Sequence, residues 1–286
     1  MTPEHFLRQW LTGRLDPTAL QWVEQTATRL AAANKEADLN LAFTLAPRKT
    51  GKADMALTAA ELAEAERVRA GWNPSLLTVD QATRLYLLLA CHATGEVFER
   101  RLDQLCATAD MAELVVLYSG LPLYPEQERY RLRAAEGART NMKIVFEAVA
   151  HRNPYPSEQL EDDAWNQMVL KALFVGSALH PIVGLDRRAN PVLARMLCDY
   201  AHERWSAGRP VSLELWRCVG PYASGGAVED LNRVLTKGTE PEKKAAALAL
   251  ASSDDPAAAR TLAAHPALAG AVANKAISWQ SLSVAA

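Results

Sequence analysis

Long apolar runs are absent from this 286-residue sequence. Apolar stretches such as ALFVGSALH (172–180) are far shorter than the roughly 20 residues that a membrane-spanning helix needs. The opening residues, MTPEHFLRQWLTGR, contain no basic segment followed by an apolar run, which is the pattern of a signal peptide. We therefore expect no transmembrane segment, no secretory leader and a cytoplasmic location.

Paired cysteines and an excess of basic charge are also missing. Cys91, Cys106, Cys198 and Cys218 are isolated in the sequence, so we expect them to be reduced, without a disulfide or a cysteine metal site. The formal net charge is −2 and the pI about 6.3. The densest basic stretch, ERYRLRAAEGART (128–140), is interleaved with glutamates. Because nucleic-acid-binding proteins usually carry a basic face, we expect no nucleic-acid partner.

No recognised catalytic or cofactor motif is present. The sequence has no Gly-rich phosphate loop, no dinucleotide fingerprint, no His-Glu-x-x-His and no serine in a G-x-S-x-G elbow. We therefore expect no cofactor and no bound metal, and we favour a protein that is not an enzyme.

Alanine and leucine are abundant, whereas only 14 residues are glycine and β-branched runs are short. Apolar residues recur at helical spacing along almost the whole chain, with short breaks at Pro and Gly. The prediction is an all-α fold of stacked helix hairpins, either a HEAT-like α-solenoid or a compact multi-helix bundle.

Three regions are expected from the change in sequence pattern along the chain. Residues 1–138 form an N-terminal helical region. Residues 139–223 form a core with apolar helices and narrow polar strips, and residues 224–286 form Ala-rich, HEAT-like C-terminal helices.

Two helices of the central region carry polar residues on otherwise apolar surfaces. In the first, predicted over 140–151, Glu147 and His151 are four residues apart and so share one strip. Such a pair can ligate a metal or transfer protons, but more often its members bond each other or a neighbouring helix. In the second, predicted over 163–178, Asn166 lies at the edge of the apolar stripe and Lys171 lies on the polar strip.

A charged loop follows these helices. The segment HPIVGLDRRANP contains His180, Asp186, Arg187 and Arg188 ahead of a helix that begins at Asn190-Pro191. Two adjacent arginines beside the free amides of a helix start could hold an anion. Asp186 could equally neutralise one of them.

The helix that starts at Asn190-Pro191 ends in the sequence His-Glu-Arg-Trp. Asp199 and His202 fall on its polar face, whereas Arg204 falls within its apolar stripe. An arginine in that position either snorkels, caps the helix C-terminus or meets a desolvated carboxylate. We expect a carboxylate partner, with Glu147 and Asp186 as the candidates, and a polar latch that also forms one wall of a groove.

Four strings of the sequence resemble the EboA family of bacterial proteins: RTNMKIVFEAVAHRNPYP, WNQMVLKALF, LHPIVGLDRRANPVLARMLCDYAHERW and ELWRCVGPY. The resemblance is specific over residues 139–223 and looser in the N-terminal half. It implies a role beside other Ebo proteins in bacterial secondary-metabolite traffic, handling or presenting a precursor for export to the periplasm. The implied partners are a small-molecule metabolite or prenylated precursor and other Ebo proteins. The family supplies no catalytic residues.

Three interpretations remain open at this stage. The first is an accessory protein whose groove binds a metabolite or a partner protein. The second is an enzyme on a helical-repeat scaffold that modifies a metabolite by acid–base or metal-assisted chemistry, using Glu147, His151, Asp186 or His202. The third is a scaffold whose charged residues are saturated by salt bridges. Convergence of the charged residues on one open cavity would favour the first two.

Overall fold

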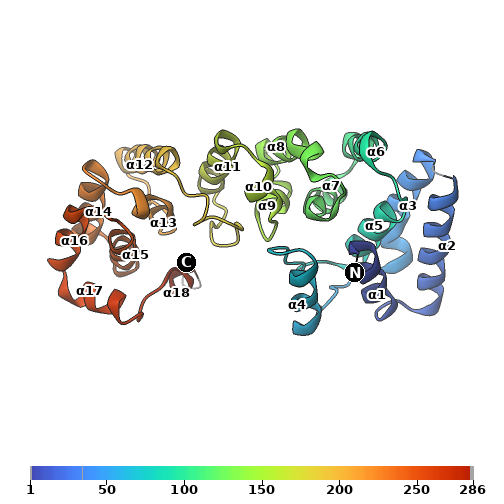
Figure 1. Cartoon of the computed structure of the whole chain (residues 1–286), viewed down its shortest axis with the longest axis horizontal. Coiled ribbons are helices and arrows are strands. Elements are labelled where there is room, and N and C mark those ends of the chain that lie inside the picture. The colour runs from blue at the N-terminus through green and yellow to red at the C-terminus, as the bar shows by residue number, and fades with distance from the viewer. Residues whose placement is uncertain (1, 34, 284–286) are drawn as a thin grey trace. The chain divides into compact units, whose positions relative to one another are not determined.

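The computed structural model of the chain describes residues 2–33 and 35–283 and confirms the all-α fold (Figure 1). These residues contain eighteen α-helices and three short 3-10 turns. One isolated antiparallel bridge joins Asp54 to Thr78, and no sheet forms in the described part of the chain. Over the same residues, none of the helices combines the length and the apolarity needed to cross a membrane.

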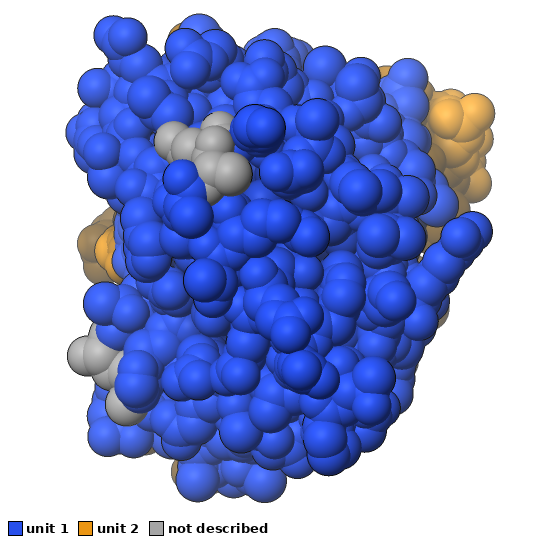
Figure 2. Space-filling model, turned by 90° about the vertical axis from the view of Figure 1, so that its right-hand side faces the viewer, with its two compact units in different colours: residues 1–160 blue, residues 161–286 orange. Residues whose placement is uncertain are grey.

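The chain divides into two compact units, Met1–Leu160 and Glu161–Ala286 (Figure 2). The division falls inside the region 139–223 that the sequence analysis treats as one core. The three-region organisation stays a prediction, and the two units are described separately below.

Unit 1 contains ten α-helices and two 3-10 turns among its described residues. These elements are α1 (Pro3–Thr12), α2 (Pro17–Ala33), α3 (Glu36–Thr50), α4 (Ala59–Val68), α5 (Val79–Leu89), α6 (Gly95–Thr108), α7 (Met111–Ser119), η1 (Leu121–Leu123), η2 (Gln127–Tyr130), α8 (Arg131–Arg139), α9 (Lys143–Ala150) and α10 (Tyr155–Gln159).

Helix α5 is the central element of this unit. It packs against α1, α2, α3 and α7, and nine of its eleven residues are buried. Two of the buried residues are charged: Arg84 Nη1 lies 3.0 Å from Asp80 Oδ2, and Arg84 Nε donates to the Phe43 carbonyl at 2.9 Å. Since every one of these groups has a partner, the helix can be enclosed on nearly all sides.

Helix α9 packs against both α7 and α8, and α7 packs against α5. The close approach depends on Gly137 in α8, where a Cβ would lie 2.5 Å from the Tyr118 ring and 2.7 Å from Val149 Cγ2. Tyr118 lies in the last turn of α7 and Val149 in the last turn of α9. This packing fixes the positions of α7 and α9, which supply one side of the site described below.

Unit 2 contains eight α-helices and one 3-10 turn among its described residues: α11 (Asp162–Phe174), α12 (Pro191–Ser206), α13 (Leu215–Val219), η3 (Gly220–Tyr222), α14 (Gly226–Lys237), α15 (Glu240–Ala251), α16 (Pro256–Ala263), α17 (Pro266–Ala273) and α18 (Trp279–Ser283). Helices that are near in sequence pack together, and α15 packs against α13, α14, α16 and α17. That pattern is typical of helical arrays, and the HEAT-like assignment stays a prediction.

Candidate functional site

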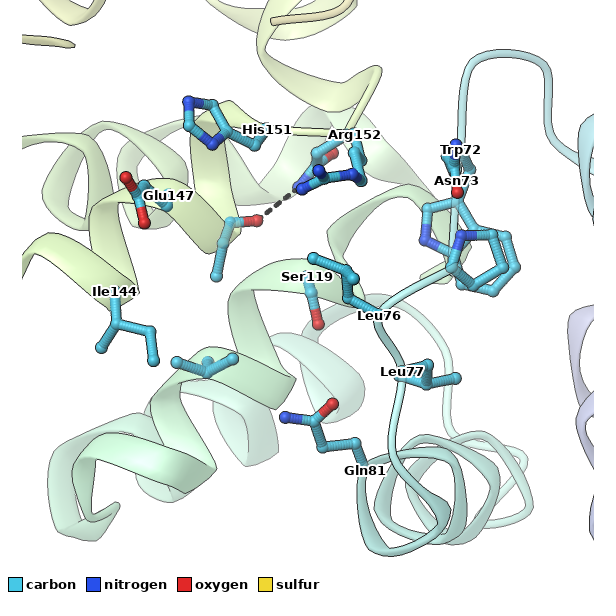
Figure 3. Close-up of a pocket in the computed structure, with 14 residues that line it drawn as sticks. Trp72, Asn73, Leu76, Leu77, Gln81, Ser119, Ile144, Glu147, His151 and Arg152 are labelled. Carbon is cyan, nitrogen blue, oxygen red and sulfur yellow. Dashed lines mark hydrogen bonds between the residues drawn. The ribbon is translucent and has the colours of Figure 1, made fainter. Parts of the chain in front are cut away.

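The candidate site is a partly open cavity of about 270 Å³ within unit 1 (Figure 3). Its lining comes from the loop between α4 and α5, the first turn of α5, α7, α9 and the three residues after α9. The lining residues are Trp72, Asn73, Pro74, Leu76, Leu77, Gln81, Val115, Ser119, Ile144, Glu147, Ala148, His151, Arg152 and Asn153.

The walls of the cavity are largely apolar. Leu76 and Ile144 approach it from opposite sides, from the α4–α5 loop and from α9 (Figure 3), and they remain 69% and 50% exposed. Leu77 and Val115 also line it. Large apolar side chains left open to water beside a concavity are a feature of ligand sites, because a bound molecule would remove them from water.

The end of α9 determines how the polar residues are presented. The sequence predicts that this helix reaches residue 151, but the structure ends it at Ala150, and His151 is already extended at φ −100° and ψ 139°. Arg152 then adopts a left-handed conformation with φ +53°. The following Asn153-Pro154 explains the break, since the residue before proline is disfavoured in a helix. His151 therefore does not continue the helical strip of Glu147, although both line the cavity.

Asn153 fixes this turn through three hydrogen bonds. Its Nδ2 donates to the carbonyls of Tyr118 and Ala148 at 3.1 Å each, and its Oδ1 accepts from Tyr155 N at 3.0 Å. The side chain is buried. These bonds tie the end of α7 to the end of α9 and hold the chain on both sides of Arg152.

The reactive groups at the cavity are few. Glu147 lies 3.8 Å from Lys143 Nζ, one turn earlier on α9, with 31% of its side chain exposed. The Ser119 hydroxyl donates to the Val116 carbonyl at 3.1 Å. Among the described residues, no three His, Cys, Asp or Glu side chains are grouped so that they could hold a metal ion. The arrangement is suited to holding a molecule by apolar contact and a few hydrogen bonds.

Of the candidate residues expected from the sequence, Glu147 and His151 lie at this cavity and the other nine belong to unit 2. At least six of those nine bond to residues outside the candidate set, and the six partners are all different. The partners are Asn190 for Asn166, Glu214 for His180, Arg217 for Asp186, Asp162 for Arg188, Asp230 for His202 and Pro210 for Arg204. Lys171 lies on α11 and Asp199 on α12, and Arg187 is exposed in the loop before α12.

The prediction that Arg204 pairs with a carboxylate, either Glu147 or Asp186, was wrong. Arg204 Nε donates to the backbone carbonyl of Pro210 at 3.0 Å. Asp186 is bound by Arg217 through two bonds of 2.6 Å. Helix periodicity placed Arg204 within the apolar stripe, but the backbone carbonyl of Pro210, six residues later, accepts its hydrogen bond, so no carboxylate is needed.

The Arg188 side chain contacts two residues of α11. Its Nη2 lies 2.5 Å from Asp162 Oδ1 in the first turn of α11, its guanidinium lies 5.0 Å from the Trp165 ring centre, and its side chain is 17% exposed. Asn166 and Asn190 exchange amide hydrogen bonds of 2.8 and 3.3 Å, and Asn190 caps α12 by accepting from Leu193 N. These bonds join α11 to the start of α12.

The two candidate histidines of unit 2, His180 and His202, each pair with a carboxylate. Glu214 accepts the backbone amides of Leu179 and His180 at 2.7 and 2.8 Å and lies 3.2 Å from His180 Nδ1. His202 Nε2 lies 2.7 and 2.8 Å from the two oxygens of Asp230 on α14.

A second cavity of about 380 Å³, in unit 2, is lined by His202, Asp230 and Cys198. Burial raises the pKa of the Cys198 thiol to about 11, so it stays protonated at neutral pH. A protonated thiol is a poor nucleophile.

Sequence reasoning missed most of the cavity. The α4–α5 loop, Gln81 and Ser119 are far in sequence from α9, and no local pattern connects them. Arg152 could have been found from the sequence, because it is a cation between an apolar helix and the helix-ending Asn153-Pro154.

The described residues form an all-α protein with a partly open cavity that has largely apolar walls and polar residues beside them. The chain belongs to the EboA family: the family model described as metabolite traffic protein EboA matches residues 4–220. The match confirms the resemblance seen in the sequence and extends it through the N-terminal half. Membership implies a role in metabolite traffic. No curated protein and no solved structure matches the chain.

Proposed function

We propose that the protein binds a small, largely apolar metabolite in the unit 1 cavity and handles it without changing it chemically. The observation that carries the proposal is the pair of exposed apolar side chains, Leu76 and Ile144, that border a cavity large enough for a small organic molecule. Family membership supplies the cellular setting, which is metabolite traffic.

In this proposal the protein is a cytoplasmic accessory protein that holds a secondary-metabolite precursor before its export to the periplasm. Other Ebo proteins would deliver or receive the molecule. Apolar burial supplies the affinity, at about 25 cal/mol per Å² of apolar surface removed from water. Glu147 and His151 line the polar rim and would orient the molecule. An accessory role is supported by the absence of a catalytic motif in the sequence.

The test is recovery of the protein from its native cells with identification of co-purifying small molecules by mass spectrometry. Ile144→Asp places a charge in the apolar wall, and it should abolish co-purification while leaving the fold intact, because the side chain is half exposed. Leu132→Asp is the matched control, since Leu132 is 80% exposed on α8 and does not line the cavity. Retention of the molecule by Ile144→Asp would contradict the proposal.

The alternative is an enzyme that modifies the metabolite by acid–base chemistry, using Glu147 and His151 at the cavity or His202 with Asp230 in unit 2. The same material distinguishes the two functions. The co-purified molecule, isolated and returned to fresh protein, should keep its mass under the binding proposal. Conversion to a product that stops in a variant of one of these residues would establish the enzyme instead.

A further inference from the structure

Arg152 contributes a positively charged side chain to the lining of the cavity. Its side chain lines the cavity and makes no hydrogen bond or ion pair with any residue that the structure describes. The residue is partly buried. An arginine carries five N–H donors and a permanent charge, so a guanidinium without an acceptor beside apolar walls is an open binding group.

The backbone holds Arg152 in place. Its φ of +53° is uncommon for a residue other than glycine, and such strain persists only where the surroundings impose it. Here the Arg152 carbonyl accepts from Asn73 N at 3.1 Å, and the neighbouring Asn153 is fixed by its three bonds. The guanidinium therefore extends from an anchored position, which lowers the entropic cost of using it to bind a ligand.

Gln81 supplies a second donor to the same cavity. Its Oε1 accepts from Thr78 N at 3.1 Å in the capping box of α5, which fixes the orientation of the amide. The two N–H groups of Gln81 Nε2 donate to no acceptor among the described residues. The carboxylate of Glu147 also lines the cavity, and Lys143 at 3.8 Å offsets part of its charge.

Resting on the proposed function, we infer that the ligand is an amphipathic organic acid. Its apolar body lies between Leu76 and Ile144, and its single anionic group binds the Arg152 guanidinium with the Gln81 amide as a further donor. A carboxylate or sulfonate fits this arrangement, because two of its oxygens can accept the paired N–H groups of arginine. Arg152 is thus the residue that determines specificity for an acid over a neutral molecule of the same shape.

Two fluorescent probes test the inference: 8-anilinonaphthalene-1-sulfonate, which is anionic, and N-phenyl-1-naphthylamine, which has the same body without the sulfonate. The full-length protein should bind the anionic probe about tenfold more tightly, a factor that corresponds to ~1.4 kcal/mol. Arg152→Ala should remove this preference and leave the affinity for the neutral probe within about twofold, because the substitution removes charge-assisted hydrogen bonds that only the anionic probe makes. Gln81→Glu, which keeps the capping oxygen, should act in the same direction.

Arg67→Ala is the matched control. Arg67 is exposed on α4 and its Nε bonds to the Ala63 carbonyl of its own helix, so neither probe should respond to its loss. Equal affinity of the wild-type protein for both probes, or equal weakening of both by Arg152→Ala, would overturn the inference and leave the proposed function standing. If Ile144→Asp leaves the affinity for both probes unchanged, or if the wild-type protein binds neither probe, the proposed function is overturned and the inference with it.

Discussion

Arg217 holds Asp186 by two parallel hydrogen bonds of 2.6 Å, Nε to Oδ1 and Nη2 to Oδ2. The Arg217 side chain is 21% exposed and that of Asp186 63% exposed. The bond to Asp186 raises the pKa of Arg217. This pair, rather than one between Asp186 and Arg204, connects the loop before α12 to α13.

The first prediction concerns this pair and is tested by a double-mutant cycle. Asp186→Asn and Arg217→Ala should show a coupling energy of about 0.5–1 kcal/mol in urea unfolding, as expected for a well-aligned ion pair that is partly open to solvent. Asp186→Asn and Arg204→Ala should be additive to within about 0.3 kcal/mol, because the two residues have separate partners. Coupling of Asp186 to Arg204 would contradict the geometry.

The second prediction concerns the buried ion pair of α5. Arg84→Ala leaves the Asp80 carboxylate buried with its Thr78 bond alone, so the free energy of unfolding should fall by about 3–5 kcal/mol. Arg100→Ala is the control, since Arg100 is 61% exposed and 3.8 Å from Glu36, and it should cost less than about 0.5 kcal/mol. Adding Asp80→Asn to Arg84→Ala should recover part of the loss, and thermal melts that show no recovery would argue against an uncompensated charge.

The third prediction concerns the packing behind the cavity. Gly137→Ala should destabilise the protein by about 1–3 kcal/mol, because the new methyl group would overlap Tyr118 and Val149. Gly270→Ala in α17 meets no atom within 4 Å and should be neutral or stabilising by up to about 1 kcal/mol. Chemical denaturation of both variants checks the contrast. A neutral Gly137→Ala would show that α8 can move away from α7 and α9.

The fourth prediction concerns acid stability. Glu61 receives both Arg14 Nη groups at 2.8 Å, and this hydrogen bonding with Arg14 lowers the pKa of Glu61 from 4.5 to about 2. Because the folded-state pKa lies below the unfolded value, the pair stabilises the protein above about pH 4.5, and the contribution is lost as the pH falls toward 2. We expect ~1–3 kcal/mol at neutral pH after allowance for partial solvent screening.

The difference in unfolding free energy between the wild type and Glu61→Gln measures this contribution, and it should shrink between pH 5 and about pH 2. Glu242→Gln is the matched control: Glu242 has the same capping role, at Thr239, without an arginine partner among the described residues. A difference that stays constant with pH would mean that the ionised Glu61 adds nothing to stability.

The sequence alone determined the all-α fold, because helical periodicity and capping are local. Asn190-Pro191 marked the start of α12, and Asn190 does accept from Leu193 N. The EboA resemblance was also readable from contiguous strings. Glu147 and His151 could be singled out because polar groups are conspicuous in and directly after an apolar helix.

Only the tertiary structure decided which side chains meet. Arg204 bonds to Pro210 and Asp186 to Arg217, because loop paths, which periodicity does not encode, bring those groups together. The cavity likewise needs the α4–α5 loop beside α9, some 70 residues away in the chain. Helical periodicity gives the direction in which each side chain points from its helix axis, whereas a binding site depends on how several helices pack against one another.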